Sequence, residues 1–121
     1  RSAAPMNAPE RYELTLLPEG CSKLKIDVES KITNAANFKI EREDHTLGNI
    51  VRMQLLRDET VLFAGYNIPH PLERHILIKV QTRPTSTPKL AVKDAVDDLK
   101  TELQTLELEF SKALANFREQ Q

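Results

Sequence analysis

The sequence is poor in several residue types, and each shortage narrows the classes of protein to consider. Tryptophan is absent and aromatic residues make up 5% of the chain, so a surface built to stack nucleobases is not expected. Cys21 is the only cysteine, which excludes an internal disulfide framework and is typical of a reducing compartment. No apolar run approaches the roughly 20 residues that a membrane-spanning helix requires. A signal peptide is not predicted, because the first 20 residues lack a basic segment followed by a long apolar one.

A basic surplus is missing as well. The 17 lysine and arginine residues are balanced by 18 aspartate and glutamate residues, whereas a free-standing nucleic-acid-binding protein usually carries excess positive charge. A chain of 121 residues is long enough for one domain with a modest core. We expect residues 6–121 to form that single domain. Residues 1–5, which precede Met6, are interpreted as a cloning remnant or an upstream extension.

Hydrophobic patterning predicts a small sheet. Alternation of apolar and polar residues, with a period of two, is typical of half-buried strands. Short runs that are bounded by proline, glycine and polar clusters support the same assignment. The predicted strands lie at residues 12–17, 24–28, 38–41, 61–66 and 76–81.

Two segments predict helices instead. The first predicted helix begins after an N-cap at Asp44 or Thr46, and its apolar residues at helical spacing continue to Leu55. A second helix is predicted at about 88–118, where Thr87 supplies the cap and a proline occupies the first turn. Strands and helices do not alternate regularly, so the predicted fold class is α+β, with the small sheet packed against two helices, one of them long and C-terminal.

The first predicted helix has a wide hydrophobic arc. Its apolar positions at helical spacing are Leu47, Ile50, Val51 and Leu55. Met53 lies outside the stripe that these four residues form. A surface helix needs only one apolar stripe about 100° wide, so the wider arc predicts that this helix is covered on two sides. Gly48 in the first turn costs about 1 kcal/mol relative to alanine. We attribute it to close approach of a partner's backbone.

The second predicted helix carries an unbroken heptad seam. Its members are Val92, Val96, Leu99, Leu103, Leu106, Phe110, Ala113 and Phe117. A helix over residues 88–118 is about 46 Å long, whereas a compact domain of this chain length is roughly 35 Å across. The helix is longer than the body that should cover it, so we expect part of the seam to contact another protein.

The sequence offers no constellation typical of catalysis or metal binding. His70 and His75 lack a Cys-x-x-Cys arm, so surface or turn positions are favoured over zinc ligation. His45 precedes Thr46 in a setting that fits a helix cap better than an acid–base pair. Cys21 has one basic neighbour and no other sign of an activated thiol. We therefore predict no catalytic residue, no cofactor and no metal.

Two stretches resemble a known family. Residues 43–49 read Glu-Asp-His-Thr-Leu-Gly-Asn, and residues 61–73 read Val-Leu-Phe-Ala-Gly-Tyr-Asn-Ile-Pro-His-Pro-Leu-Glu. Together with the Met-Asn-Ala-Pro run that starts at Met6, they closely resemble the small alpha-like (eleventh) subunits of eukaryotic RNA polymerase II. The resemblance extends over essentially the whole chain from Met6 onward. It implies a fold like the dimerisation domain of the bacterial polymerase alpha subunit.

The resemblance also implies a function. Such a subunit is a non-catalytic nuclear protein without a cofactor, and it forms a heterodimer with the larger alpha-like (third) subunit. The heterodimer scaffolds the two large catalytic subunits for mRNA transcription. Both predicted helices form the implied partner interface, with Leu47, Gly48, Ile50, Val51, Leu55, Leu99, Leu103, Leu106, Phe110, Ala113 and Phe117 as its residues.

Other functions compete with this one. The related small alpha-like subunit of polymerases I and III has a similar helix motif. A small nucleic-acid-binding module of a transcription complex is a second alternative, although the balanced charge and the few aromatic residues count against direct nucleic-acid binding. A small enzyme is a third, and it would need the catalytic constellation that the sequence lacks.

Overall fold

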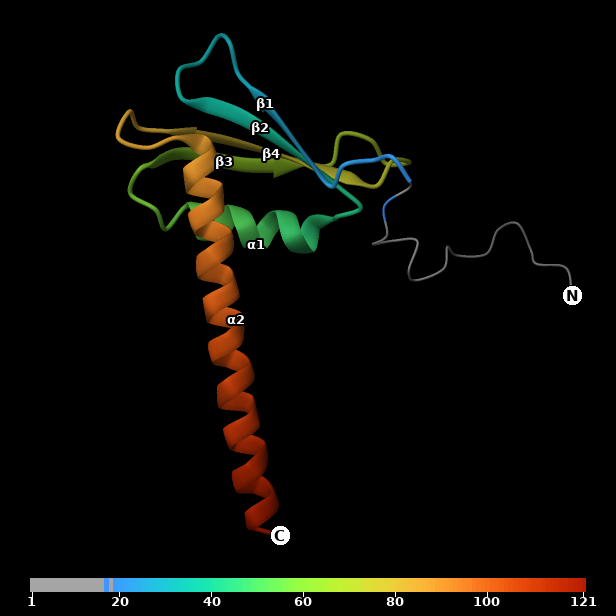
Figure 1. Cartoon of the computed structure of the whole chain (residues 1–121), viewed down its shortest axis with the longest axis vertical. Coiled ribbons are helices and arrows are strands. Elements are labelled where there is room, and N and C mark those ends of the chain that lie inside the picture. Colours follow the sequence, from blue (N-terminus) through green and yellow to red (C-terminus); the bar gives the residue numbers. More distant parts are fainter. Residues whose placement is uncertain (1–16, 18) are drawn as a thin grey trace, which may run out of the picture.

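One antiparallel sheet and two helices make up the described part of the chain (Figure 1), which is Leu17 and residues 19–121 of the computed structural model. The elements confirm the predicted α+β class. In chain order they are β1 (Leu24–Val28), β2 (Ala35–Glu41), α1 (His45–Leu55), β3 (Val61–Asn67), β4 (His75–Thr82) and α2 (Pro88–Glu119).

Two expectations concern the start of the chain, and Leu17 is the only residue of the two segments that the structure describes. The extension at residues 1–5 lies outside the described residues, as does most of the strand expected at residues 12–17. Leu17, which is described, is not part of a strand.

The four strands pair in the order β1-β2-β4-β3, and every pair is antiparallel. Phe38 of β2 lies between Ile26 of β1 and Ile78 of β4. Successive side chains of a strand point to opposite faces, so these three residues share one face, while Lys39 and Lys79 lie on the other. The first face holds the core, in which Phe38, Ile76, Ile78 and Val80 are fully buried.

Helix α1 begins where the sequence predicts. The Asp44 carboxylate accepts a hydrogen bond from the backbone N–H of Thr46 at 2.9 Å. That bond, with a smaller contribution from Arg74, holds the pKa of Asp44 below its ordinary value. An N-cap of this kind satisfies a backbone donor that the helix leaves unpaired. From there Val51 and Leu55 pack into the core over β3 and β4.

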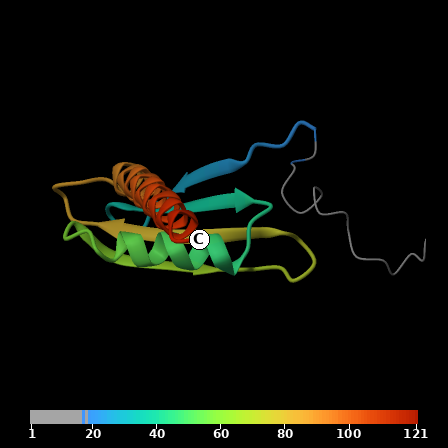
Figure 2. The ribbon, with the colours of Figure 1, turned by 90° about the horizontal axis from the view of Figure 1, so that it is seen from below.

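Helix α2 divides into a packed half and a protruding half. Thr87 caps it by accepting from the Leu90 backbone N–H at 3.2 Å. Ala91 and Ala95 are buried against the core, and α2 contacts α1, β2 and β4. Figure 2 shows both helices on the same face of the sheet. Every residue from 101 to 121 is exposed, because this half of α2 extends away from the sheet (Figure 1).

The packed half of α2 corrects the predicted seam. The residues buried most deeply are Ala91 and Ala95, whereas Val96 remains 37% exposed. Val92 and Leu99 are only partly buried beside the core. Small side chains let the helix approach the sheet closely, so alanines form the contact line that the larger valines were predicted to form.

Candidate partner-binding surface

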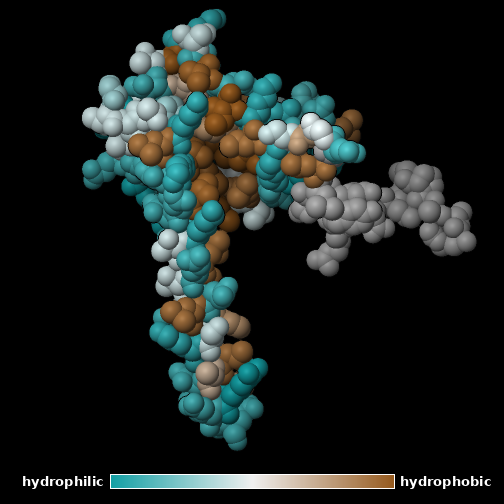
Figure 3. Space-filling model, viewed as in Figure 1, coloured by the Kyte–Doolittle hydropathy of each residue, from teal (hydrophilic) through white to brown (hydrophobic). Residues whose placement is uncertain are grey.

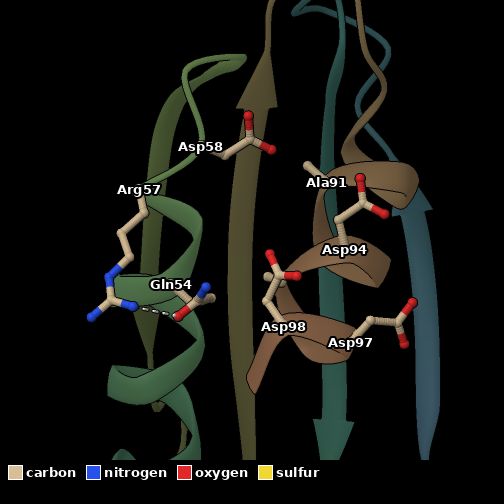
Figure 4. A pocket seen from close by; sticks show the side chains of 8 residues that line it. Gln54, Arg57, Asp58, Ala91, Asp94, Asp97 and Asp98 are labelled. Atoms are coloured by element: carbon tan, nitrogen blue, oxygen red, sulfur yellow. Dashed lines mark hydrogen bonds between the residues drawn. The ribbon is translucent and has the colours of Figure 1, made fainter. Parts of the chain in front are cut away.

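A polar pocket lies between α1 and the packed half of α2 (Figure 4). Its volume is about 310 Å³, and no serine, cysteine or histidine lines it. The Arg57 guanidinium donates to Gln54 at 3.2 Å and to Glu102 at 2.8 Å. A hydrogen bond from Lys93 lowers the pKa of Asp97. The pocket is therefore a solvated cleft with ordinary ion pairs. Its lining is Gln54, Arg57, Asp58, Ala91, Asp94, Ala95, Asp97 and Asp98.

The histidines are placed by local contacts. His45 Nδ1 lies 3.1 Å from the Tyr66 hydroxyl, so its partner is a strand residue and not a neighbouring carboxylate. His75 is 5% exposed and its ring centroid lies 5.9 Å from that of His70. The expectation of surface or turn positions is thus wrong for His75, which begins β4. Within Leu17 and residues 19–121, no group of three or more histidine, cysteine or acidic residues is placed to hold a metal ion.

Helix α1 exposes only part of its hydrophobic arc. Ile50, Met53 and Leu56 are 44%, 53% and 53% exposed. Leu47 is partly buried against the core. The exposed side chains lie on the side of α1 that the sheet leaves uncovered, which agrees with the expectation of a helix that needs cover on two sides.

Three of the residues expected at the partner interface belong to the chain's own core. Gly48, Val51 and Leu55 are buried within α1's contact with the sheet, with Leu55 at 0% exposure. The wide arc of α1 is thus divided between an inner face toward the sheet and an outer face toward solvent. A direct contact of these three residues with a partner stays a prediction.

Gly48 does mark a close approach, but to the chain's own strand. A Cβ atom at this position would lie 2.6 Å from Cδ2 and 2.9 Å from Cγ of Tyr66. Tyr66 belongs to β3 and its hydroxyl is held by His45. The close approach seen within the chain is that of an aromatic ring across the first turn of α1, and the approach to a partner's backbone stays a prediction.

The protruding half of α2 carries the largest side chains of the predicted seam. Leu103, Leu106, Phe110 and Phe117 are 64%, 65%, 67% and 57% exposed, and Ala113 is exposed as well. We refer to these five residues as the distal seam. Leu99 marks its inner limit, since it packs partly against the core. The chain itself therefore leaves the distal seam almost uncovered.

Strand β1 adds a hydrophobic surface that the sequence did not identify as a site. Leu24, Ile26 and Val28 are 43%, 36% and 71% exposed. They lie opposite Ile40, Phe38 and Ala36 in the sheet, so they share the helix-bearing face beyond the edge of α2. Figure 3 shows hydrophobic side chains gathered beside α2 over the sheet and again along the protruding helix. The alternation of β1 was predicted, but its lack of cover depends on where α2 crosses the sheet.

This arrangement of an open hydrophobic face and a projecting helix has counterparts among known proteins. The family model of the RNA polymerase Rpb3/Rpb11 dimerisation domain matches residues 35–109. The chain belongs to this family. The matched range begins at β2 and ends within the distal seam, so it includes Leu103 and Leu106, and Phe110 follows it directly.

Relatives in the Rpb3/Rpb11 family are similar over most of their length. A protein of Dictyostelium discoideum named DNA-directed RNA polymerase II subunit rpb11 is 45% identical over 105 residues, which cover 87% of this chain and 88% of the relative. The Schizosaccharomyces pombe protein named DNA-directed RNA polymerase II subunit RPB11 is 46% identical over 107 residues, which cover 88% and 86%.

A solved structure of the same architecture comes from an archaeon. The crystal structure of DNA-directed RNA polymerase subunit L from Thermoplasma acidophilum aligns with a TM-score of 0.66 at 26% identity. The alignment covers 83% of this chain and 98% of the archaeal one. The sheet with two helices on one face is therefore shared by this Rpb3/Rpb11-family chain and an archaeal polymerase subunit.

No helix in the described part of this family member is apolar and long enough to cross a membrane.

Proposed function

We propose that this chain is the small alpha-like subunit of RNA polymerase II, a non-catalytic assembly subunit that acts as half of a heterodimer. Its partner is the larger alpha-like (third) subunit. The pair scaffolds the two large catalytic subunits in the nucleus. Membership of a dimerisation-domain family and relatives named as RNA polymerase II subunits support this assignment. The observation that carries it is the exposed distal seam.

The free energy of burying the distal seam favours a stable complex over a transient contact. Burying a large hydrophobic side chain stabilises a protein by about 1.5–3 kcal/mol. The distal seam offers four such side chains, and α1 and β1 expose further ones. Apolar side chains exposed in this number would promote aggregation if they stayed uncovered. Coverage by another chain therefore supplies both stability and solubility.

Two alternatives receive less support. The small alpha-like subunit shared by polymerases I and III would have the same fold, but the relatives from an amoeba and a yeast carry RNA polymerase II names. A nucleic-acid-binding module would need a basic surface, and the formal net charge of this chain is −1. Neither alternative explains the apolar distal seam better than heterodimer assembly does.

Coexpression tests the proposal. We expect the chain to self-associate or precipitate when produced alone, and to become soluble in a one-to-one complex when produced with the larger alpha-like subunit of the same polymerase. Size-exclusion chromatography with light scattering measures both states. A chain that is a soluble monomer alone, and that does not bind the larger subunit, would contradict the proposed function.

A further inference from the structure

We infer that the surface that covers the distal seam is lined on both sides by lysine or arginine, and that glutamates of this chain select such a partner over a second copy of the chain. The inference rests on the proposed function and specifies the chemistry of the partner. The three glutamates concerned, called the acidic flanks below, are Glu102, Glu107 and Glu109.

The acidic flanks border the inner part of the distal seam, from Leu103 to Phe110, on both sides. Residues 101–111 contain three glutamates and no basic residue, and Lys100 and Lys112 lie directly outside that range. With Leu103 and Leu106 at heptad positions a and d, Glu102 and Glu109 occupy g, and Glu107 occupies e. Positions e and g lie directly beside the seam, on opposite edges. A partner that buries the seam must therefore pass its own side chains close to these carboxylates.

Contacts within the chain neutralise the acidic flanks only partly. Glu102 accepts from Arg57 at 2.8 Å, so its charge is already paired. Glu109 lies 3.6 Å from Lys112, and both side chains are more than 60% exposed. An exposed pair of this kind contributes little and exchanges readily for a better one. Ion pairs with a basic partner are consequently expected to stabilise the complex most at Glu107 and Glu109.

A second copy of the chain would meet these charges unfavourably in a parallel pair and would gain nothing from them in an antiparallel one. Two distal seams paired antiparallel bring g edges together, which places Glu102 of one copy beside Glu109 of the other. They also bring e edges together, which places Glu107 beside Lys100, so repulsion and attraction balance. Two seams paired in parallel bring g against e, which places Glu102 beside Glu107. Like charges in contact act against the wrong partner, whereas basic residues in the same places attract the right one.

Neutralising the flanks tests the inference without changing the seam. The variant carries Glu107→Gln and Glu109→Gln, and Glu102 is left intact because it pairs with Arg57. The control carries Gln104→Lys and Ser111→Lys, which lie away from the seam and raise the net charge by the same two units. Glutamine, glutamate and lysine have similar helix propensities, so α2 stays helical in both proteins.

Affinity for the larger alpha-like subunit is measured at two salt concentrations. In about 0.1 M salt we expect the glutamine variant to bind at least about fivefold more weakly than wild type, which is about 1 kcal/mol, and the control to stay within about twofold of wild type. In about 1 M salt, where the screening length falls from about 10 to about 3 Å, the difference should vanish. The variant should also capture more of a labelled second copy than wild type does.

The outcomes separate the two proposals. If the wild-type chain does not bind the larger subunit, the proposed function fails. If wild type binds and the glutamine variant binds equally well, or loses affinity equally at both salt concentrations, the acidic flanks do not select the partner. Increased capture of the second copy by the control, but not by the glutamine variant, would also overturn the inference.

Discussion

Gly48 and Tyr66 form a close packing contact between α1 and β3. The ring crosses the first turn of α1 where any side chain atom would lie within 3 Å of it. The ring is also fixed by the contact of its hydroxyl with His45 at 3.1 Å. A glycine inside a helix normally costs about 1 kcal/mol, and here that cost is offset by the packing of a partly buried aromatic side chain against the core.

Substituting Gly48→Ala should therefore destabilise the chain although alanine favours helix. Overpacking typically costs about 1–3 kcal/mol, which outweighs a propensity gain of about 1 kcal/mol. We expect a net loss of roughly 1 kcal/mol in the free energy of unfolding, measured by urea denaturation of the heterodimer.

A double substitution isolates the cause of that loss. With Tyr66→Ala in the background, Gly48→Ala should become neutral or stabilising, because the ring that meets the new methyl group is gone. If Gly48→Ala destabilises both backgrounds equally, the contact with Tyr66 is not what excludes a side chain at this position.

Single residues also show where the sequence was insufficient. The buried position of His75 depends on β4 pairing with β2, in which Glu41 lies opposite it, and nothing next to it in the sequence reports that pairing. Gly48 was correctly expected to lie in close packing, but its neighbour comes from another element. Local patterns identify an unusual residue, and the tertiary fold identifies its contact.

At the scale of elements, α2 combines two surfaces in one continuous helix. Its first turns pack on the sheet through Ala91 and Ala95, while the distal seam carries leucine and phenylalanine. Small residues suit a close helix–sheet contact, and large exposed ones suit a contact with another protein. This difference separates folding of the chain from assembly with a partner.

Variants of the distal seam should lose the partner and keep the fold. Leu103→Glu would place a carboxylate in the interface, and Phe110→Ala removes a side chain whose burial typically contributes about 3–5 kcal/mol. We expect both variants to fail in coexpression pull-downs with the larger alpha-like subunit.

The matched control is Gln104→Glu, which adds the same charge as Leu103→Glu at an exposed residue of α2 that lies away from the seam and should cost less than about 0.5 kcal/mol. Circular dichroism of the unpaired chains should be alike in all three variants, since residues 101–121 make little contact with the sheet. Normal assembly of both seam variants would show that the distal seam is not part of the interface.

The elements themselves were largely predictable. Alternation located β1, and caps located both helices, with α2 beginning at Pro88 as predicted. The length of α2 correctly indicated that part of its seam leaves the body. The face that α2 turns toward the sheet was not predictable from the heptad pattern, because alanine contributes weakly to hydrophobic periodicity and yet packs most closely.

At the scale of the whole molecule, the charge distribution bears on nucleic acid. The outer face of the sheet carries Lys25 opposite Lys39, with Lys79 on the next strand. Asp27 and Glu41 interrupt this basic group on the same face. The chain thus has no uninterrupted basic surface on the sheet, in agreement with its formal net charge of −1.

The chain should accordingly show no measurable affinity for duplex DNA at physiological salt. Nonspecific binding requires several simultaneous phosphate contacts from lysine or arginine. Fluorescence anisotropy of a labelled duplex, titrated with the chain, tests this expectation. A dissociation constant of about 1 µM or tighter, with a steep dependence on salt, would contradict it.

The order of elements along the chain has a consequence for synthesis in the cell. Every strand of the sheet precedes α2, so a ribosome completes the sheet and α1 before it makes the distal seam. Domains fold as units during translation at about 5–20 residues per second, so the sheet and α1 have seconds in which to fold while the protruding half of α2 is being made. The part of the chain that folds by itself is therefore synthesised before the distal seam, and an unassembled copy exposes that seam together with the apolar side chains of α1 and β1.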